Sequence, residues 1–332
     1  YYSFFTTINM NQPLRFTLKV LRKLLKDRSY TWRTDEFCDF IGQEGNDYIA
    51  SLLHENAGCK GLMLAKFGTI ELSNIIAYII DSRGLAFNDY IKHIQGKIDI
   101  DIEGTGRLLH KNSGVFPEER SIVENFVKLA LEDCRQIDVL ASYIDKEKYL
   151  KEELGNCKRV DLDAFYAPFL WEKPWTKELE GKRVLVVHPF VESIASQYHN
   201  HRKLLFENPD VLPEFKELIC IKAVQSVAGE KVPFKDWFEA LEFMKAEIDK
   251  CGYDVALIGC GAYGMSLAAH VKRSGKIGIH LAGWLQMLFG VYGNRWIKDQ
   301  PEYAGFINEH WIRPNVNERI KNGSKIENGC YW

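Results

Sequence analysis

Short apolar runs that alternate with amphipathic segments fill the second half of the chain, and they constrain its fold more than any other feature. Strands are predicted at 183–187, 218–223, 255–258 and 277–280. Helices are predicted between them, at 192–206, 235–250 and 262–272. Short buried strands separated by helices are typical of parallel βαβ units. The sequence therefore predicts an α/β fold with a mostly parallel sheet and helices on both faces.

The first half follows the same pattern less regularly. Apolar runs predict strands at 62–65 and 137–143, and helical spacing predicts helices at 71–80 and from Pro117 and Glu118 to Arg135. Further helices are predicted at 14–27 and 35–55, the second broken near Gly42 to Gly45. By contrast, 84–117 is Gly-rich and predicted to be irregular, and 145–181 is predicted to hold a short helix and a long aromatic connection.

These patterns divide the chain into three predicted regions. An N-terminal helical segment covers 1–57 and the α/β core covers 58–296. After Trp296 the periodicity fades, so 297–332 is expected to wrap over the core. The first residue is Tyr rather than Met, which suggests an upstream or processed N-terminus.

Composition and charge argue against several classes of protein. Of 332 residues, 46% are hydrophobic and 27% are charged, as in ordinary globular proteins, and a net charge of -2 gives no electrostatic reason to bind nucleic acid. The eight cysteines form no C-x-x-C pair, so reduced thiols in a cytoplasmic protein are expected. No apolar run reaches the about 18 residues of a membrane span, and no signal peptide is recognisable.

The basic amphipathic segment 14–27 has two interpretations. Its lysines and leucines suit peripheral contact with an anionic membrane at the inner face. A helix that simply caps the domain explains the same pattern and is favoured.

The segment DVALIGCGAYG contains a G-x-G-x-x-G pattern at Gly259, Gly261 and Gly264. Such loops, between a strand and a helix, bring backbone N–H groups and the helix dipole to a phosphate. NAD binding also calls for an acidic residue at the end of the next strand, and His280 stands there instead. We therefore consider a mononucleotide or nucleotide-sugar first, glycines that only permit close packing second, and NAD or FAD last.

Polar residues follow several of the predicted strands at their carboxyl ends. Lys66, Thr69 and Glu71 follow the strand predicted at 62–65, and His188, Glu192 and Ser193 follow the strand at 183–187. Lys222, Gln225 and Ser226 lie at or after the end of the strand at 218–223, and His280 ends the strand at 277–280. Because the carboxyl ends of parallel strands meet at one edge of a sheet, these residues are expected to share a single cleft.

Each of these residues has a functional and a structural interpretation. Glu71 is either a ligand for a hard divalent cation or an acidic residue favoured by a helix N-terminus. His188 and Glu192 could supply a general base, or could merely end a strand and begin a helix. Lys222 and Arg202 could neutralise phosphate, or could form surface ion pairs. Residues Gln286, Arg295 and Trp296 follow the last strand, where aromatic residues more often belong to the core.

Several segments resemble one family of enzymes. KFGTIE at 66–71 resembles the R-F-G-D-x-E segment of glycosyltransferases with the GT-D fold. HPFVESI, IKAVQS, DWFEAL, DVALIGCGAYGMSLAAHVKRSGK, HLAGWLQMLFGVYGNRW and the final ENGCYW look like the ordered blocks of a bacterial branch often found with surface-polysaccharide genes. The resemblance covers residues 50–332 and is most specific over 182–296.

This resemblance implies a Rossmann-like nucleotide-binding core, a nucleotide-sugar donor, and Mn²⁺ or Mg²⁺ at a D-x-E motif. Here that motif is Thr69-Ile70-Glu71, so only Glu71 carries over as a metal ligand, and metal dependence is in question. Donor binding is expected from Lys66, Gly68, Thr69, Arg202, Lys222, Gln225, Gly259, Gly261, Tyr263, Gly264, His280, Gln286 and Arg295.

The expected function is transfer of a sugar, from a UDP-sugar or similar donor, to a glycan or lipid-linked acceptor in bacterial surface-polysaccharide or glycoconjugate synthesis. Glu192 or His188 is the candidate base for the acceptor hydroxyl. One alternative is a non-catalytic nucleotide- or glycan-binding protein, because Thr69 leaves the metal motif incomplete. A weaker alternative is an NAD-dependent oxidoreductase.

Overall fold

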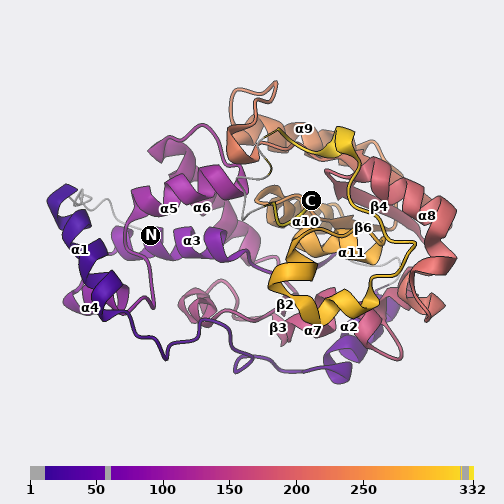
Figure 1. The fold of residues 1–332 in the computed structure, drawn as a ribbon, viewed down its shortest axis with the longest axis horizontal. Coiled ribbons are helices and arrows are strands. Elements are labelled where there is room, and N and C mark those ends of the chain that lie inside the picture. Colours follow the sequence, from indigo (N-terminus) through magenta and orange to yellow (C-terminus); the bar gives the residue numbers. More distant parts are fainter. Residues whose placement is uncertain (1–11, 57–60, 322, 324–328) are drawn as a thin grey trace.

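A single sheet of seven parallel strands forms the centre of the molecule, in the order β3-β2-β1-β7-β6-β4-β5 (Figure 1). The structure is a computed structural model that describes residues 12–56, 61–321, 323 and 329–332. The strands are β1 (Leu62–Ala65), β2 (Val139–Ala141), β3 (Lys158–Val160), β4 (Arg183–His188), β5 (Glu217–Lys222), β6 (Val255–Ile258) and β7 (Ile277–His280). The predicted α/β fold with a Rossmann-like parallel sheet is thus confirmed.

The apolar runs form strands because helices cover both faces of the sheet. Every residue of β1, β6 and β7 is buried, which is possible only in a sheet packed on both sides. The register pairs Val255 with Ile277 and Ile258 with His280, so β6 and β7 end together. The carboxyl ends of the central strands therefore lie along one edge.

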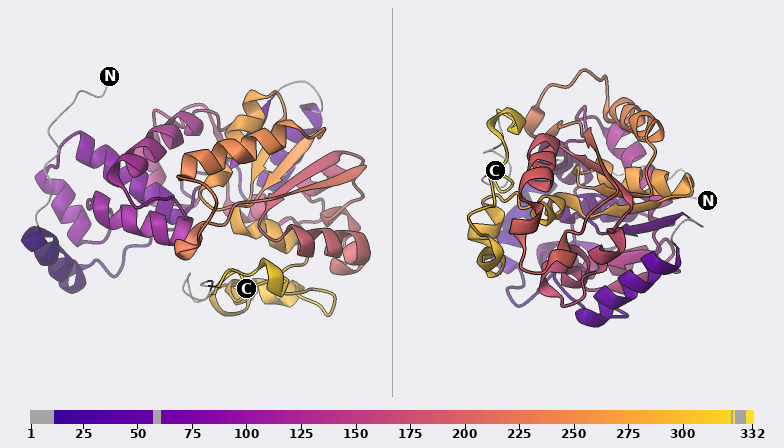
Figure 2. Two further views of the ribbon diagram at one scale, coloured as in Figure 1. Left: turned by 90° about the horizontal axis from the view of Figure 1, so that it is seen from above. Right: turned by 90° about the vertical axis from the view of Figure 1, so that its right-hand side faces the viewer.

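The direction of the crossovers decides which helices lie on which face. The chain moves one way along the sheet from β4 to β5 and the opposite way from β5 through β6 to β7. Parallel crossovers are right-handed, so α8 (Val191–Leu205) lies on one face, and α9 (Trp237–Asp249) and α10 (Tyr263–Arg273) lie on the other (Figure 2). Neighbouring strands β4 and β6 are therefore followed by helices on opposite faces, which makes a topological switch point between His188 and Gly259.

The remaining helices extend the molecule beyond the sheet. Helix α6 (Arg120–Cys134) packs on α10, and α2 (Gln43–Glu55) packs on α7 (Leu162–Tyr166). Helices α3 (Thr69–Ser82) and α5 (Ile102–Leu108) contact each other, and α1 (Gln12–Leu25) contacts α4 (Phe87–Ile94) at the end of the molecule away from α8 (Figure 1). Helix α11 (Leu285–Leu288) follows β7 closely.

Three local predictions were wrong. Residues 35–42 are not helical: Phe40 forms an isolated bridge with Val160, and Gly42, at a φ of 63°, precedes α2. The Gly-rich segment 84–117 is largely helical, because Gly84, Gly96 and Gly114 adopt positive φ between short helices and do not break up the whole segment. Strand β3 lies within the predicted long connection, at the sheet edge.

The C-terminal residues in the described part run back across the α8 side of the core. Val291 forms a bridge with Ile312, and the backbone N–H of Arg295 donates to the Cys330 carbonyl at 2.9 Å. Glu318 reaches the start of α8, where its carboxylate accepts the backbone N–H of Glu192 at 2.7 Å. Residues 1–11 and the first two residues of the predicted ENGCYW block lie outside the described residues.

Candidate functional site

A cavity of about 470 Å³ opens at the carboxyl edge of the sheet, around the switch point between β4 and β6. Its walls come from the residues that follow β1, β2, β4, β5, β6 and β7, together with part of the C-terminal segment. This is the place where open α/β sheets bind ligands, and the volume is within the usual range for ligand pockets.

Most of the residues singled out from the sequence line this cavity. They are Lys66, Gly68, Thr69, Glu71, His188, Gln225, Gly259, Gly261, Tyr263, His280, Gln286 and Arg295. They come from separate parts of the chain, and the parallel sheet brings them to one edge. Glu192, Arg202, Lys222 and Gly264 are not part of the lining.

The G-x-G-x-x-G loop forms one wall of the cavity. Gly261 adopts a φ of 59°, which a residue with a side chain rarely tolerates. At Gly259, a Cβ would lie 2.5 Å from the Ala282 carbonyl oxygen and 2.8 Å from His188 Cδ2, so the backbones and this ring approach closely. The loop glycines thus have clear packing roles, while Gly259 and Gly261 also face the cavity.

Tyr263, the first residue of α10, fixes the side of the cavity near β5. Its ring stacks on Trp237 with centroids 5.0 Å apart, and its hydroxyl lies 3.0 Å from Ser226 Oγ. Ser226 Oγ also donates to the Gly114 carbonyl at 2.6 Å. This chain of contacts joins the loop after β5 to α10 and to the segment after α5, and thereby shapes the cavity wall.

His188, at the end of β4, is buried in the neutral form. Burial lowers the pKa of its imidazole from 6.5 to about 3. The backbone N–H of Phe190 donates to His188 Nδ1 at 3.0 Å, so Nε2 carries the proton. In this tautomer His188 is a hydrogen-bond donor at Nε2, which argues against the predicted role as a general base.

His280, at the end of β7, is also buried and neutral. Burial, aided by the positive charge of Lys66, lowers its pKa to about 3. Its Nδ1 is buried with no hydrogen-bond partner among the residues that the structure describes. Its ring packs against Gly264, where no room remains for a Cβ, and this explains why the second residue of α10 is a glycine.

Lys66 places a buried positive charge near His280. Its side chain is only 8% exposed, and Nζ lies 5.3 Å from the centre of the Tyr143 ring. The Tyr143 ring offsets part of the cost of burying this ammonium, and a positive charge at the cavity wall attracts an anionic ligand.

Glu71, in the first turn of α3, provides a carboxylate to the cavity. Its side chain folds back against Gly68, the residue before the helix, where no Cβ could be accommodated. In the described ranges, no group of three or more His, Cys, Asp and Glu side chains could hold a metal ion. Since Glu71 is the only carboxylate of the Thr69-Ile70-Glu71 motif, a hard cation here would take most of its ligands from the phosphates of a bound donor.

Arg295 brings a second cation to the cavity from the region after β7. Its guanidinium stacks over the Tyr331 ring at 4.5 Å, and Nη2 donates to Cys330 Sγ at 3.3 Å. Gln286 Nε2 donates to the carbonyl oxygens of Val291 at 3.2 Å and Tyr331 at 3.3 Å. These contacts hold the last residues of the chain against the cavity.

The predicted residues outside the cavity make contacts of another kind. Lys222 and Glu192 form an ion pair at 3.4 Å, with both side chains about half exposed. Arg202 pairs with Glu214 at 3.2 Å and donates to the Leu212 carbonyl at 3.3 Å. For these three residues, the structural interpretation from the sequence is the better one.

Sequence reasoning missed Glu318, which decides the role of the α8 N-terminus. Its buried carboxylate accepts the N–H groups of Glu192 and Ser193 and the Ser193 hydroxyl. An anionic ligand is therefore not needed at the start of α8, and Glu318 satisfies the donors there. Asp299, Gln300 and Trp332, which also line the cavity, belong to the same aperiodic C-terminal region and carried no recognisable signal.

Comparisons with known proteins give no match: no family model, no curated protein and no solved structure matches this chain. Within the described ranges, none of the helices has the length and apolar character that crossing a bilayer requires.

Proposed function

We propose that this chain is a glycosyltransferase that uses a nucleotide-sugar donor, and that the cavity at the carboxyl edge of the sheet is its donor site. The convergence of Lys66, Arg295 and two neutral histidines on one cavity carries the proposal. Cations and N–H donors at this place suit a diphosphate, and the resemblance of KFGTIE and the later blocks to GT-D glycosyltransferases supports a sugar as the second half of the ligand.

In this proposal, the donor diphosphate lies between Lys66 and Arg295. Negative charge develops on the diphosphate as the bond to the sugar breaks, and fixed cations in a water-poor cavity stabilise that charge in the transition state. His188 Nε2–H donates a hydrogen bond to the same group of oxygens. These stabilising groups are the protein's own residues.

Glu71 is the carboxylate to which we assign contact with the reacting sugar or its acceptor. It lines the cavity at the start of α3, whereas Glu192, the base predicted from the sequence, points into an ion pair with Lys222 outside it. The proposed acceptor is a glycan or a lipid-linked glycan, and the proposed setting is surface-polysaccharide or glycoconjugate synthesis on the cytoplasmic side of the membrane.

A thermal-shift screen tests the proposed ligand class. A ligand that binds the folded state raises its apparent melting temperature by mass action. Nucleoside diphosphate sugars, nucleoside diphosphates and NAD(P) are compared with and without Mn²⁺. We expect stabilisation by a nucleoside diphosphate sugar, greatly reduced in Lys66→Met and retained in the matched control Lys222→Met. Stabilisation by NAD(P) alone would reject the proposal.

A non-catalytic binding protein is the second candidate, favoured by the incomplete metal motif at Thr69 and Glu71. It predicts the same thermal shift with neither transfer nor hydrolysis of the donor. Release of nucleoside diphosphate from a stabilising donor separates the two candidates, because only the enzyme breaks the bond to the sugar.

A further inference from the structure

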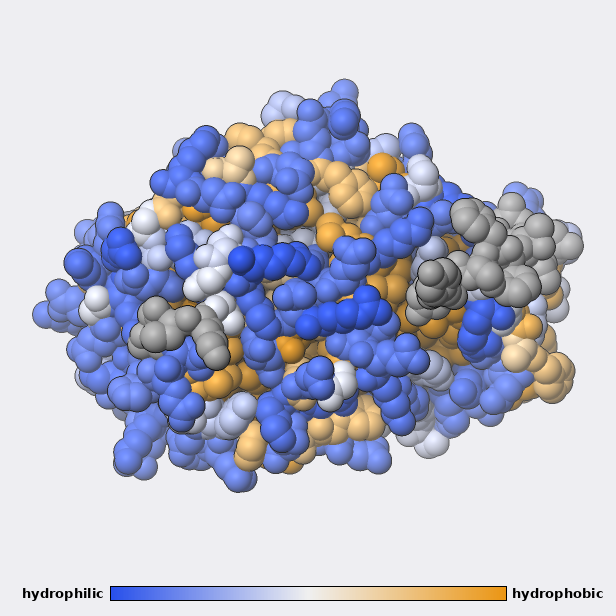
Figure 3. Space-filling view, turned by 180° about the vertical axis from the view of Figure 1, so that it is seen from behind, coloured by the Kyte–Doolittle hydropathy of each residue, from blue (hydrophilic) through white to orange (hydrophobic). Residues whose placement is uncertain are grey.

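Helix α1 presents an apolar face to solvent at the end of the molecule away from α8. Phe16 is 71% exposed, Val20 41% and Leu24 72%, and their spacing of four residues puts them in one stripe. Leu18, on the opposite side of the helix, is buried. In Figure 3 this end of the molecule lies on the right, and hydrophobic side chains reach the surface there beside hydrophilic ones.

Positive charge borders this stripe. Lys19 and Lys23 are exposed and lie one position before Val20 and Leu24, and α1 contains no acidic residue. A helix with aromatic and aliphatic residues next to lysines, and with no carboxylate to repel phosphate, is typical of helices that lie in the interface of an anionic membrane.

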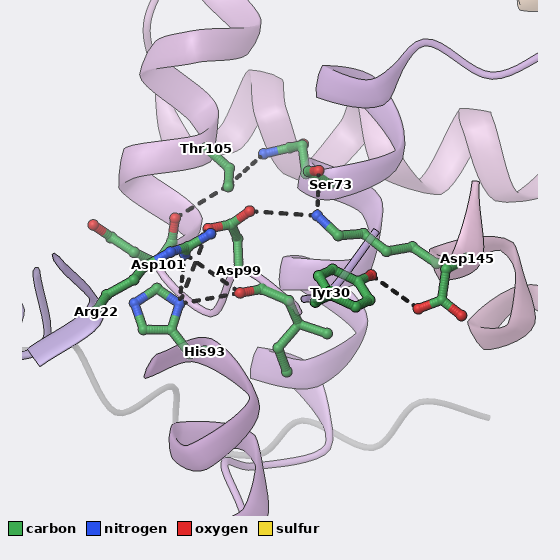
Figure 4. Close-up of polar contacts among 11 residues, drawn as sticks. Arg22, Tyr30, Ser73, His93, Asp99, Asp101, Thr105 and Asp145 are labelled. Carbon is green, nitrogen blue, oxygen red and sulfur yellow. Dashed lines mark hydrogen bonds and ion pairs between the residues drawn. The ribbon is translucent and has the colours of Figure 1, made fainter. Parts of the chain in front are cut away.

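Ion pairs on the inner side hold α1 in this orientation. Arg22 pairs with Asp99 and lies 3.1 Å from His93 Nδ1 (Figure 4). Asp99 also lies 3.5 Å from Lys146 Nζ, which donates to Ser73 Oγ at 2.9 Å. Since Ser73 belongs to α3, this network ties α1 to the body of the molecule and keeps the apolar stripe outward.

A second cavity, of about 370 Å³, lies beneath α1 and carries excess positive charge. Its lining includes the cations Arg15, Lys19, Arg22, Arg107 and Lys111 and the carboxylates Asp99 and Asp101. Arg15 and Arg22 pair with carboxylates, whereas Lys19, Arg107 and Lys111 have no ion pair among the residues that the structure describes. Three cations, from α1, α5 and the turn after α5, thus remain available at this cavity for phosphate groups.

We propose that this end of the molecule is a binding surface for anionic phospholipid, in which Phe16, Val20 and Leu24 enter the interface of the bilayer and the cations around the second cavity bind headgroup phosphates. Helix α4, which packs against α1, carries another exposed apolar residue, Phe87, which is 81% exposed. The combination of an apolar stripe and unpaired cations fits a lipid surface better than a soluble anion, which would use the cations alone. The proposal does not depend on the enzymatic activity.

Vesicle co-sedimentation tests the surface directly. The full chain is mixed with vesicles of phosphatidylcholine alone or with about one third phosphatidylglycerol. We expect binding to the anionic vesicles only, weakened by added salt because exposed charges are screened. Phe16→Asp/Leu24→Asp should abolish binding, and Lys19→Gln/Lys23→Gln should weaken it about fivefold for each charge removed.

Matched variants outside α1 provide the controls. Val316→Asp changes an exposed apolar residue next to Asn315, which contacts the start of α8, and Lys203→Gln changes a lysine of α8, so both should bind vesicles as the parent does. Circular dichroism verifies that each variant is folded. Failure of the parent to bind anionic vesicles would overturn the proposal. So would a dimer that Phe16→Asp/Leu24→Asp dissociates, since a second copy would then cover the face, or vesicle binding that appears only after deletion of residues 1–11.

Discussion

The imidazole of His280 occupies the space that a Cβ on Gly264 would need. This contact joins the end of β7 to the start of α10 and holds a neutral, buried histidine at the cavity. Gly264, the third glycine of the G-x-G-x-x-G pattern, is therefore required by the His280 ring. In a dinucleotide-binding protein, an acidic residue would occupy the position of His280. The glycine pattern and His280, the residue that does not fit a dinucleotide-binding site, thus belong to the same packing contact.

Replacement of Gly264 by alanine tests this arrangement. In an exposed helix the change would stabilise by up to about 1 kcal/mol through helix propensity. Here the added methyl group must displace His280 or α10, so we expect a destabilisation of about 1–3 kcal/mol in urea unfolding. Gly305→Ala is the control, because a Cβ there meets nothing within 4 Å, and it should stay within about 0.5 kcal/mol of the parent. A Gly264→Ala variant as stable as the parent would contradict the contact.

The two buried histidines predict how stability depends on pH. Both pKa values are about 3 in the folded state against 6.5 for the free side chain, so below pH 6.5 the unfolded chain binds protons that the folded chain does not. Stability should therefore fall as the pH is lowered from 6.5 towards 3, with each histidine contributing up to about 1.4 kcal/mol per pH unit.

A variant separates this effect from that of other titrating groups. Urea unfolding is measured between about pH 5 and 6.5, where the unfolded state binds histidine protons that the folded state does not and where ordinary carboxylates stay ionised. In His280→Gln, the unfolding free energy should change less steeply with pH than in the parent, and the difference between the two slopes should be about the contribution of one histidine. Equal slopes for the two proteins would show that His280 is not held neutral.

Glu318 gives a prediction for a residue that no sequence pattern marked. Its carboxylate accepts hydrogen bonds from the backbone of Glu192 and Ser193, and Glu318→Ala would leave these buried donors unpaired. We expect a loss of about 1.5–3 kcal/mol in unfolding free energy, with the affinity for a nucleotide ligand unchanged because Glu318 is not part of the cavity lining. Glu309→Ala, at an exposed glutamate, serves as the control. A normal stability, or a selective loss of nucleotide binding, would disagree with this capping role.

The fold was largely predictable because burial on both faces of a parallel sheet makes each central strand a short but uninterrupted apolar run. Strands β1, β6 and β7 were placed at their observed bounds for this reason. Strand β3, with the sequence Lys158-Arg159-Val160, was missed, because an edge strand needs only one buried residue. The short helices of 84–117 were missed because glycines that end helices resemble glycines that prevent them.

The site was predictable where it depends on the ends of strands and unpredictable where it depends on distant contacts. Lys66, His188 and His280 lie at the cavity because the sheet determines where strands end. Glu192 lies outside the cavity, where its side chain pairs with Lys222 and its backbone N–H is held by Glu318, which comes 126 residues later along the chain. Such a contact between an aperiodic segment and a helix start leaves no periodic trace in the sequence.

Glu71 should be essential for transfer if the proposed function holds. Glu71→Gln keeps the size of the side chain and removes its charge, so we expect a fall in rate of about two orders of magnitude, as for other single polar groups in transition states. Glu242→Gln, on the exposed surface of α9, should keep the parent rate. The assay is repeated across a Mn²⁺ titration: activity of Glu71→Gln that returns at high Mn²⁺ would assign Glu71 to cation binding, and parent activity at every concentration would exclude it from the mechanism.

The most direct measurement of the central claim is the release of nucleoside diphosphate from a panel of nucleotide-sugars, with and without glycan and lipid-linked acceptors. Product is measured for the parent, for Lys66→Met inside the cavity and for Lys222→Met outside it. We expect one donor to be consumed by the parent and by Lys222→Met, and Lys66→Met to lose most of this activity because the cavity cation no longer stabilises the leaving diphosphate. No release from any donor, or equal loss in both lysine variants, would rule out this cavity as the donor site of a glycosyltransferase.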